Sequence, residues 1–139
     1  FAFAYIDIDH FKAYNDALSL NQNSGILNPT QLAFIYERIG TSYNKLGQSE
    51  DAIKTLRKCV QTAPMDSAAH YQLALAYAVL GRYQESVHAL SETFRSAPST
   101  GELKRYILLS KTDTELEPVR DISAYKAMLE EHRPRSHAR

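Results

Sequence analysis

The sequence predicts an all-α fold of stacked helical hairpins, an α-solenoid, from three observations. The chain repeats itself at a spacing of 34 residues. Each copy holds two stretches with apolar residues three and four positions apart, which is the spacing of one helix face. A glycine separates the two stretches, and a proline follows the second. The residues that recur 34 positions later are Tyr43 and Tyr77, Leu46 and Leu80, Gly47 and Gly81, Leu56 and Leu90, Ala63 and Ala97, and Pro64 and Pro98. A period of about 34 residues is typical of hairpins that bury their apolar faces against one another.

Residues 33–66 are predicted to form the first hairpin. Gly47 should separate its helices, because glycine costs about 1 kcal/mol inside a helix and suits a left-handed turn. Pro64 ends the second helix, since proline cannot continue it. The apolar faces of the two helices consist of Ala33, Tyr36, Ile39, Gly40 and Tyr43, and of Ala52, Ile53, Leu56, Cys59 and Val60.

Residues 67–100 repeat this plan. Gly81 marks the turn and Pro98 marks the end of the unit. The apolar faces of this second hairpin consist of Leu73, Ala74, Tyr77 and Leu80, and of Val87, Leu90 and Phe94.

These two units resemble the tetratricopeptide repeat. The first unit matches that pattern at Tyr36, Ile39, Gly40, Tyr43, Gly47, Ala52, Leu56 and Pro64. The second matches at Leu73, Ala74, Tyr77, Gly81, Leu90 and Pro98, and departs at His70, Ser86 and Thr93. The resemblance implies a right-handed superhelix whose first helices line a concave groove, and a role in binding other proteins.

Residues 101–132 are interpreted as a degenerate repeat with a capping helix. Leu103, Tyr106 and Ile107 favour one short helix, a polar stretch covers 112–117, and Pro118 suits a first helical turn. A closing helix is predicted from Ile122, Tyr125, Met128 and Leu129, and the segment from Leu116 to Leu129 resembles the ending of many bacterial tetratricopeptide arrays. We therefore expect an array over 30–132 with about three hairpins and a cap. Residues 133–139 are expected to be a disordered basic tail.

Residues 1–29 allow two interpretations. In the first, Phe11, Tyr14, Ala17 and Leu18 belong to the last helix of an earlier, partial repeat, and residues 21–29 form an enlarged loop. In the second, residues 5–16 resemble the opening motif of the diguanylate cyclases, the GGDEF family. That resemblance implies a strand at its start and assigns Asp7 to a metal ion, Lys12 to a phosphate and Asn15 to a guanine base. The Gly-Gly-Asp/Glu-Glu-Phe turn and the rest of that domain are missing from the chain.

Composition excludes several classes of function. The 16 basic and 16 acidic residues give a net charge of zero, so we expect no nucleic-acid partner. No apolar run is long enough to insert into a membrane. One cysteine excludes an internal disulfide and favours the cytoplasm, with the periplasm still open. Because the chain begins at Phe1, we expect it to be a fragment or a processed product.

No catalytic site, metal site or cofactor is predicted. The histidines do not have the spacing of metal ligands. Cys59 and His70 are expected to be interior residues of the hairpins. No glycine-rich phosphate loop or nucleophile elbow is present.

The family's geometry implies which residues line the groove. In the first unit they are Phe34, Glu37, Arg38, Thr41, Asn44 and Lys45. In the second and third units they are Ala68, Tyr71, Gln72, Leu75, Ala78 and Val79, and Glu102, Arg105, Tyr106 and Leu109. Glu37 and Thr41 stand where the chaperone-binding subclass has Lys and Asn, so we expect no binding to the carboxylate of a chaperone tail.

The expected function is therefore that of a non-catalytic adaptor or scaffold, which holds a peptide or helix with apolar and acidic residues. Two alternatives stay open at this point. One is a regulatory part of a bacterial signalling protein linked to cyclic-di-GMP, and the other is self-association through the terminal repeats.

Overall fold

The computed structural model describes residues 2–133, and for residues 2–10 and 23 it describes the backbone alone. Within this range every regular element is a helix, so the predicted all-α class is confirmed. The elements are α1 (Ala2–Ser24), α2 (Pro29–Lys45), α3 (Ser49–Thr62), α4 (Ser67–Val79), α5 (Tyr83–Ser96), α6 (Thr100–Thr112), the 3-10 helix η1 (Thr114–Val119) and α7 (Ser123–Glu131).

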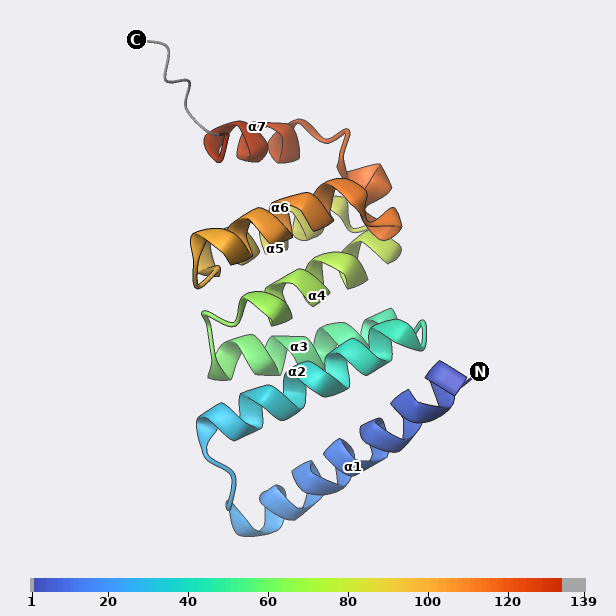
Figure 1. The fold of residues 1–139 in the computed structure, drawn as a ribbon. Coiled ribbons are helices and arrows are strands. Elements are labelled where there is room, and N and C mark those ends of the chain that lie inside the picture. Colours follow the sequence, from blue (N-terminus) through green and yellow to red (C-terminus); the bar gives the residue numbers. More distant parts are fainter. Residues whose placement is uncertain (1, 134–139) are drawn as a thin grey trace.

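The helices stack in the order of the chain, from α1 at one end to α7 at the other (Figure 1). Helices α2 and α3 form one hairpin, α4 and α5 form the next, and α3 packs on α4 to join the two. Helices α2 and α4 also touch directly, so the first helices of both hairpins share one surface. The buried residues of these units form one hydrophobic cluster that continues into η1 and α7.

Both hairpins turn in the same way at their glycines. Gly47 has φ of 76° and Gly81 has φ of 77°, a left-handed conformation that glycine adopts without steric cost. After the first glycine, the amide of Gln48 donates to the carbonyl of Tyr43 at 2.9 Å, and after the second, the amide of Arg82 donates to Tyr77 at 2.9 Å. These bonds satisfy carbonyl groups that the end of a helix leaves without partners.

The two helices of the first hairpin approach most closely at Gly40. A Cβ atom added at this glycine would lie 2.4 Å from Cγ of Leu56, which is completely buried. The absence of a side chain on α2 therefore makes room for a core leucine of α3.

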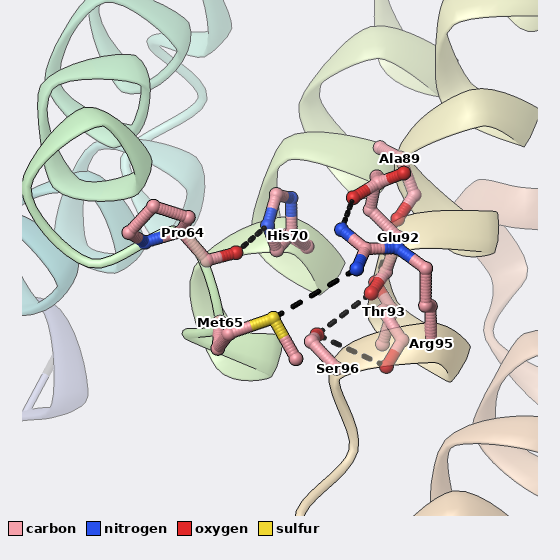
Figure 2. A network of polar contacts seen from close by, with 8 residues as sticks. All are labelled: Pro64, Met65, His70, Ala89, Glu92, Thr93, Arg95 and Ser96. Atoms are coloured by element: carbon pink, nitrogen blue, oxygen red, sulfur yellow. Dashed lines mark hydrogen bonds and ion pairs between the residues drawn. The ribbon is translucent and has the colours of Figure 1, made fainter.

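The polar departures in the second hairpin all find backbone partners. A ring nitrogen of His70, Nε2, lies 2.8 Å from the carbonyl of Pro64, and Thr93 donates to the carbonyl of Ala89 at 2.8 Å (Figure 2). Ser86 donates across the hairpin to the carbonyl of Ala74 at 2.7 Å. Buried polar groups are tolerated when they are hydrogen-bonded, so these residues fit the interior of the repeat.

Helix α1 lies at one end of the stack (Figure 1). It packs against α2, and the ring of Phe11 lies 4.8 Å from the ring of Tyr43 in an edge-on contact. Residues 5–8, where the cyclase resemblance implies a strand, lie within this helix.

The loop predicted at 21–29 is shorter in the structure, because α1 continues to Ser24. Gly25 ends the helix at φ of 62°, and its amide donates to the carbonyl of Asn21. The side chain of Asn28 then caps α2 by accepting a hydrogen bond from the amide of Gln31. The side chain of Gln31 in turn accepts one from the amide of Asn28.

The last unit closes the stack with η1 and α7. Leu116 and Val119 of η1 are completely buried, and η1 packs on α4. The guanidinium of Arg120 donates to the carbonyls of Ser110 and Asp113, which holds the end of α6. Tyr125 of α7 is buried and its hydroxyl lies 2.8 Å from that of Ser110. The segment after α6 is thus an ordered cap of the hydrophobic core.

Candidate functional site

The six groove residues predicted on α2 form one continuous stripe, which we call the α2 stripe. Its members are Phe34, Glu37, Arg38, Thr41, Asn44 and Lys45. They lie three and four positions apart, so they share one face of the helix. Phe34 is 53% exposed although it is a large apolar residue, and its ring lies 5.5 Å below the guanidinium carbon of Arg38. Lys45 at the other end of the stripe is also exposed.

A groove of about 290 Å³ opens along the C-terminal half of the α2 stripe. We call it the polar groove. Helices α2 and α4 form two sides of it, and the residues after α6 form the third. It is lined by Thr41, Asn44, Lys45, Gln72, Leu75, Val79, Asp113 and Glu115. The side chain of Asn44 donates to the backbone carbonyl of Gln72 at 3.0 Å and to its side-chain oxygen at 2.9 Å. This pair fixes α2 to α4 at the floor of the groove.

Three of the predicted groove residues, Tyr71, Ala78 and Tyr106, are buried instead. The two tyrosines are 5% and 4% exposed, and their rings lie 5.4 Å apart. The hydroxyl of Tyr71 donates to the carboxylate of Asp113. Burial, together with this bond, raises the pKa of the Tyr71 hydroxyl, so it stays protonated as a donor. These tyrosines therefore support the wall of the polar groove from inside.

Arg105 remains at the surface beside them. Its guanidinium carbon lies 4.6 Å from the ring of Tyr106, and it forms an ion pair with Glu102 at 2.9 Å. Arg105 is absent from the lining of the polar groove. Of the predicted residues, those that line the polar groove therefore come from α2 and α4.

Glu37 lies in the middle of the α2 stripe and is half-buried. Burial raises its pKa, the carboxylate of Asp66 adds to the rise, and a hydrogen bond of 2.8 Å from the hydroxyl of Thr41 opposes it. A second carboxylate placed on this spot would be repelled.

A second opening, which we call the apolar cleft, lies between α1 and α2 at the other end of the α2 stripe. Its volume is about 590 Å³. It is lined by Ala13, Tyr14, Ala17, Leu27, Thr30, Gln31, Phe34 and Ile35, none of which is charged. The ring of Tyr14 meets that of Phe34 edge-on, with centroids 6.2 Å apart. The small side chains of Ala13 and Ala17 leave the space between the two helices open.

Sequence reasoning missed the two acidic residues of the polar groove, Asp113 and Glu115, and the apolar cleft. Asp113 and Glu115 fall in a polar stretch that the pattern assigns to a connection between helices. Only the packing of η1 on α4 brings them beside α2. The available signal in the sequence was the pair of apolar residues Leu116 and Val119 close to this polar stretch. Both are completely buried in the structure.

Of the three residues of the cyclase alternative, the structure describes the side chains of Lys12 and Asn15. The side chain of Asn15 donates to the carbonyl of Phe11 in its own helix at 3.0 Å, and Lys12 is exposed. Asp7 lies in α1, and its side chain is outside the described residues.

Cys59 and His70 are interior residues, as predicted. Cys59 is completely buried, and its thiol lies 3.2 Å from the carbonyl of Ala33. Burial and the nearby carboxylate of Asp66 raise the pKa of this thiol, which keeps it in the unreactive protonated form. His70 is 8% exposed. Among the described residues, no group of three or more acidic, histidine or cysteine side chains is arranged to hold a metal ion.

Comparison with known proteins gives one family match. The model of the family "Anaphase-promoting complex, cyclosome, subunit 3", which has tetratricopeptide-like repeats, matches residues 28–93. The matched segment begins at the cap of α2 and ends within α5, so it covers both hairpins. No curated protein matches the chain. Within residues 2–133, no helix has the length and apolar character needed to cross a bilayer.

Proposed function

We propose that this chain, whose two hairpins match a family with tetratricopeptide-like repeats, is a non-catalytic interaction module that holds a peptide or helix of a partner protein along the α2 stripe. Repeat proteins of this type stack hairpins into an extended surface, and such surfaces suit extended ligands. The match to a family of repeat proteins and the helical stack support a protein-binding role in general. The position and chemistry of the ligand are our inference.

The observation that supports this site is that exposed apolar and polar groups lie together on the α2 stripe and beside its two openings. Phe34 of the stripe and Val79 of α4, which lines the polar groove, are 53% and 57% exposed, which is high for large apolar residues. The bond from Asn44 to Gln72 holds the groove floor in place before any ligand arrives. A site that is already formed binds with a smaller loss of conformational entropy.

The electrostatics of Glu37 support the prediction that chaperone tails do not bind here. A terminal carboxylate next to this half-buried carboxyl group would be repelled, and the hydroxyl of Thr41 already donates to it. We therefore propose that the ligand is an internal segment of its protein and not a free C-terminus.

The test is a selection of random displayed peptides on the wild-type protein. The groove variant carries Val79→Arg, which places a positive charge and a long side chain at an exposed position that lines the polar groove. A matched control carries Ser91→Arg, which is exposed on α5. We expect the selected peptides to bind the control as they bind the wild type and to bind the groove variant about tenfold more weakly or worse.

Circular dichroism should show equal helicity for all three proteins, since every substituted residue is at the surface. Peptides that bind the groove variant as tightly as the wild type would contradict the proposed site.

A link to cyclic-di-GMP signalling has a separate test. Calorimetry with GTP and Mg²⁺ should give no heat of binding, because Asn15 is bonded within its own helix. Measurable heat that disappears in Lys12→Ala would favour the alternative.

A further inference from the structure

We propose that the ligand has two anchors: a large apolar side chain that enters the apolar cleft, and a lysine or arginine that enters the polar groove about 15 Å away. This inference rests on the proposed function, since it specifies the ligand of the same surface. It also changes one expectation from the sequence, because the ligand's charged anchor is basic and not acidic.

The two openings belong to one binding track because the α2 stripe runs from one to the other. Phe34 lines the apolar cleft, and Asn44 lines the polar groove on the same face of α2. With a rise of about 1.5 Å per residue, the ten residue steps from Phe34 to Asn44 span about 15 Å. An extended peptide covers that distance in about four or five residues, and a helix covers it in about three turns.

The apolar cleft selects for an uncharged anchor. None of its lining residues carries a charge, and a buried charge without a partner would be strongly unfavourable there. The exposed ring of Phe34 and the edge of Tyr14 offer aromatic surface to a leucine, methionine or aromatic side chain. The volume of about 590 Å³ is within the range of ligand pockets.

The polar groove selects for a cation. Its lining has two carboxylates, Asp113 and Glu115, and one ammonium group, that of Lys45. Asp113 accepts a hydrogen bond from Tyr71, which fixes its position, and a carboxylate can accept further bonds. Glu115 is exposed at the rim. The lining therefore has an excess of one negative charge, which a lysine or arginine would balance.

The peptide selection described above tests this inference when the selected pools are sequenced. The wild-type pool should be enriched in peptides with a large apolar residue and a basic residue about four or five positions apart. Selection on Glu115→Lys should replace the basic residue by an acidic one, and selection on Phe34→Ser should remove the apolar preference. The control Glu131→Lys makes the same charge change on the exposed surface of α7 and should give the wild-type pool.

Anisotropy with one labelled peptide from the wild-type pool gives the magnitude. Exchange of its basic residue for glutamate should weaken binding to the wild type about tenfold and strengthen binding to Glu115→Lys. A wild-type pool without a basic residue at this spacing, or a pool that does not change with Glu115→Lys, would overturn the two-anchor ligand. The proposed function would survive that result if the peptides still lose binding to the groove variant, and it would fail if they do not.

Discussion

The α2–α3 hairpin and the α4–α5 hairpin share one backbone plan and differ in how their interiors are filled. In the first, α2 contributes Gly40 where Leu56 of α3 packs. In the second, the positions 34 residues later are Ala74 and Leu90. The same leucine therefore faces a glycine in one unit and an alanine in the other. The turn geometry is nearly identical in both, with φ of 76° at Gly47 and 77° at Gly81.

The two interiors also differ in polarity. Ala52 of the first hairpin corresponds to Ser86 of the second, and Cys59 corresponds to Thr93. Each polar residue of the second hairpin donates to a backbone carbonyl. The comparison teaches that the repeat tolerates small polar residues in its core where a backbone carbonyl lies within hydrogen-bonding distance.

The largest effect is expected from removing the leucine that both hairpins share. Leu56→Ala and Leu90→Ala should each lower the free energy of unfolding by about 2–5 kcal/mol, because both side chains are completely buried and truncation leaves a cavity. Chemical denaturation followed by circular dichroism measures this. A loss below about 1 kcal/mol in either variant would mean that the hairpin interior is looser than the structure indicates.

A smaller effect is expected at the glycine that distinguishes the hairpins. Gly40→Ala should destabilise the protein by about 1–3 kcal/mol, since the new methyl group would meet Leu56. The reverse change, Ala74→Gly, should cost about 1 kcal/mol through the lower helix propensity of glycine.

A double-mutant cycle tests the cause of the Gly40 effect. The loss in Gly40→Ala with Leu56→Ala should be smaller than the sum of the two single losses, because the clash disappears with the leucine. Additive losses would show that the two residues do not interact.

The polar interior of the second hairpin should contribute less. Ser86→Ala removes the bond of 2.7 Å to the carbonyl of Ala74 and should lower stability by about 0.5–1.5 kcal/mol. Thermal denaturation monitors the change. The reverse substitution in the first hairpin, Ala52→Ser, serves as the comparison, and a serine tolerated equally well there would show that the repeat supplies the carbonyl at both places.

The smallest effect concerns pH. Burial raises the pKa of Glu37 above its ordinary 4.5. Protonation of Glu37 therefore adds to the free energy of unfolding. This contribution is fully present below pH 4.5 and is lost as the pH rises through the higher pKa that Glu37 has in the folded protein. Glu37→Gln should be more stable than the wild type at pH 7, by about 0.5 kcal/mol or less, and the advantage should vanish near pH 4. Denaturation curves at both pH values test the sign, and an advantage that grows at low pH would reverse it.

The sequence pattern was sufficient for the hairpins and insufficient for the openings beside them. Local backbone preferences explain the effect of Gly47, Gly81 and Pro64, so that effect can be predicted from the sequence alone. The family's geometry likewise placed the α2 stripe on one face. Tyr71 and Tyr106 were expected at the surface, and they are buried because η1 folds over α4. That contact depends on packing between distant segments, which no local preference encodes.

The position of α4 has a consequence for how the molecule opens. Helix α4 packs against α2, α3, α5 and η1, whereas the principal neighbour of α1 is α2. In a linear stack, each unit depends on those beside it, and the ends are held by fewer contacts. Backbone amides should therefore exchange with deuterium slowest in α4 and fastest in α1. Helix α1, which forms one side of the apolar cleft, should open locally many times for each unfolding of the whole stack. An apolar anchor seated between α1 and α2 would then slow exchange at that end of the molecule first.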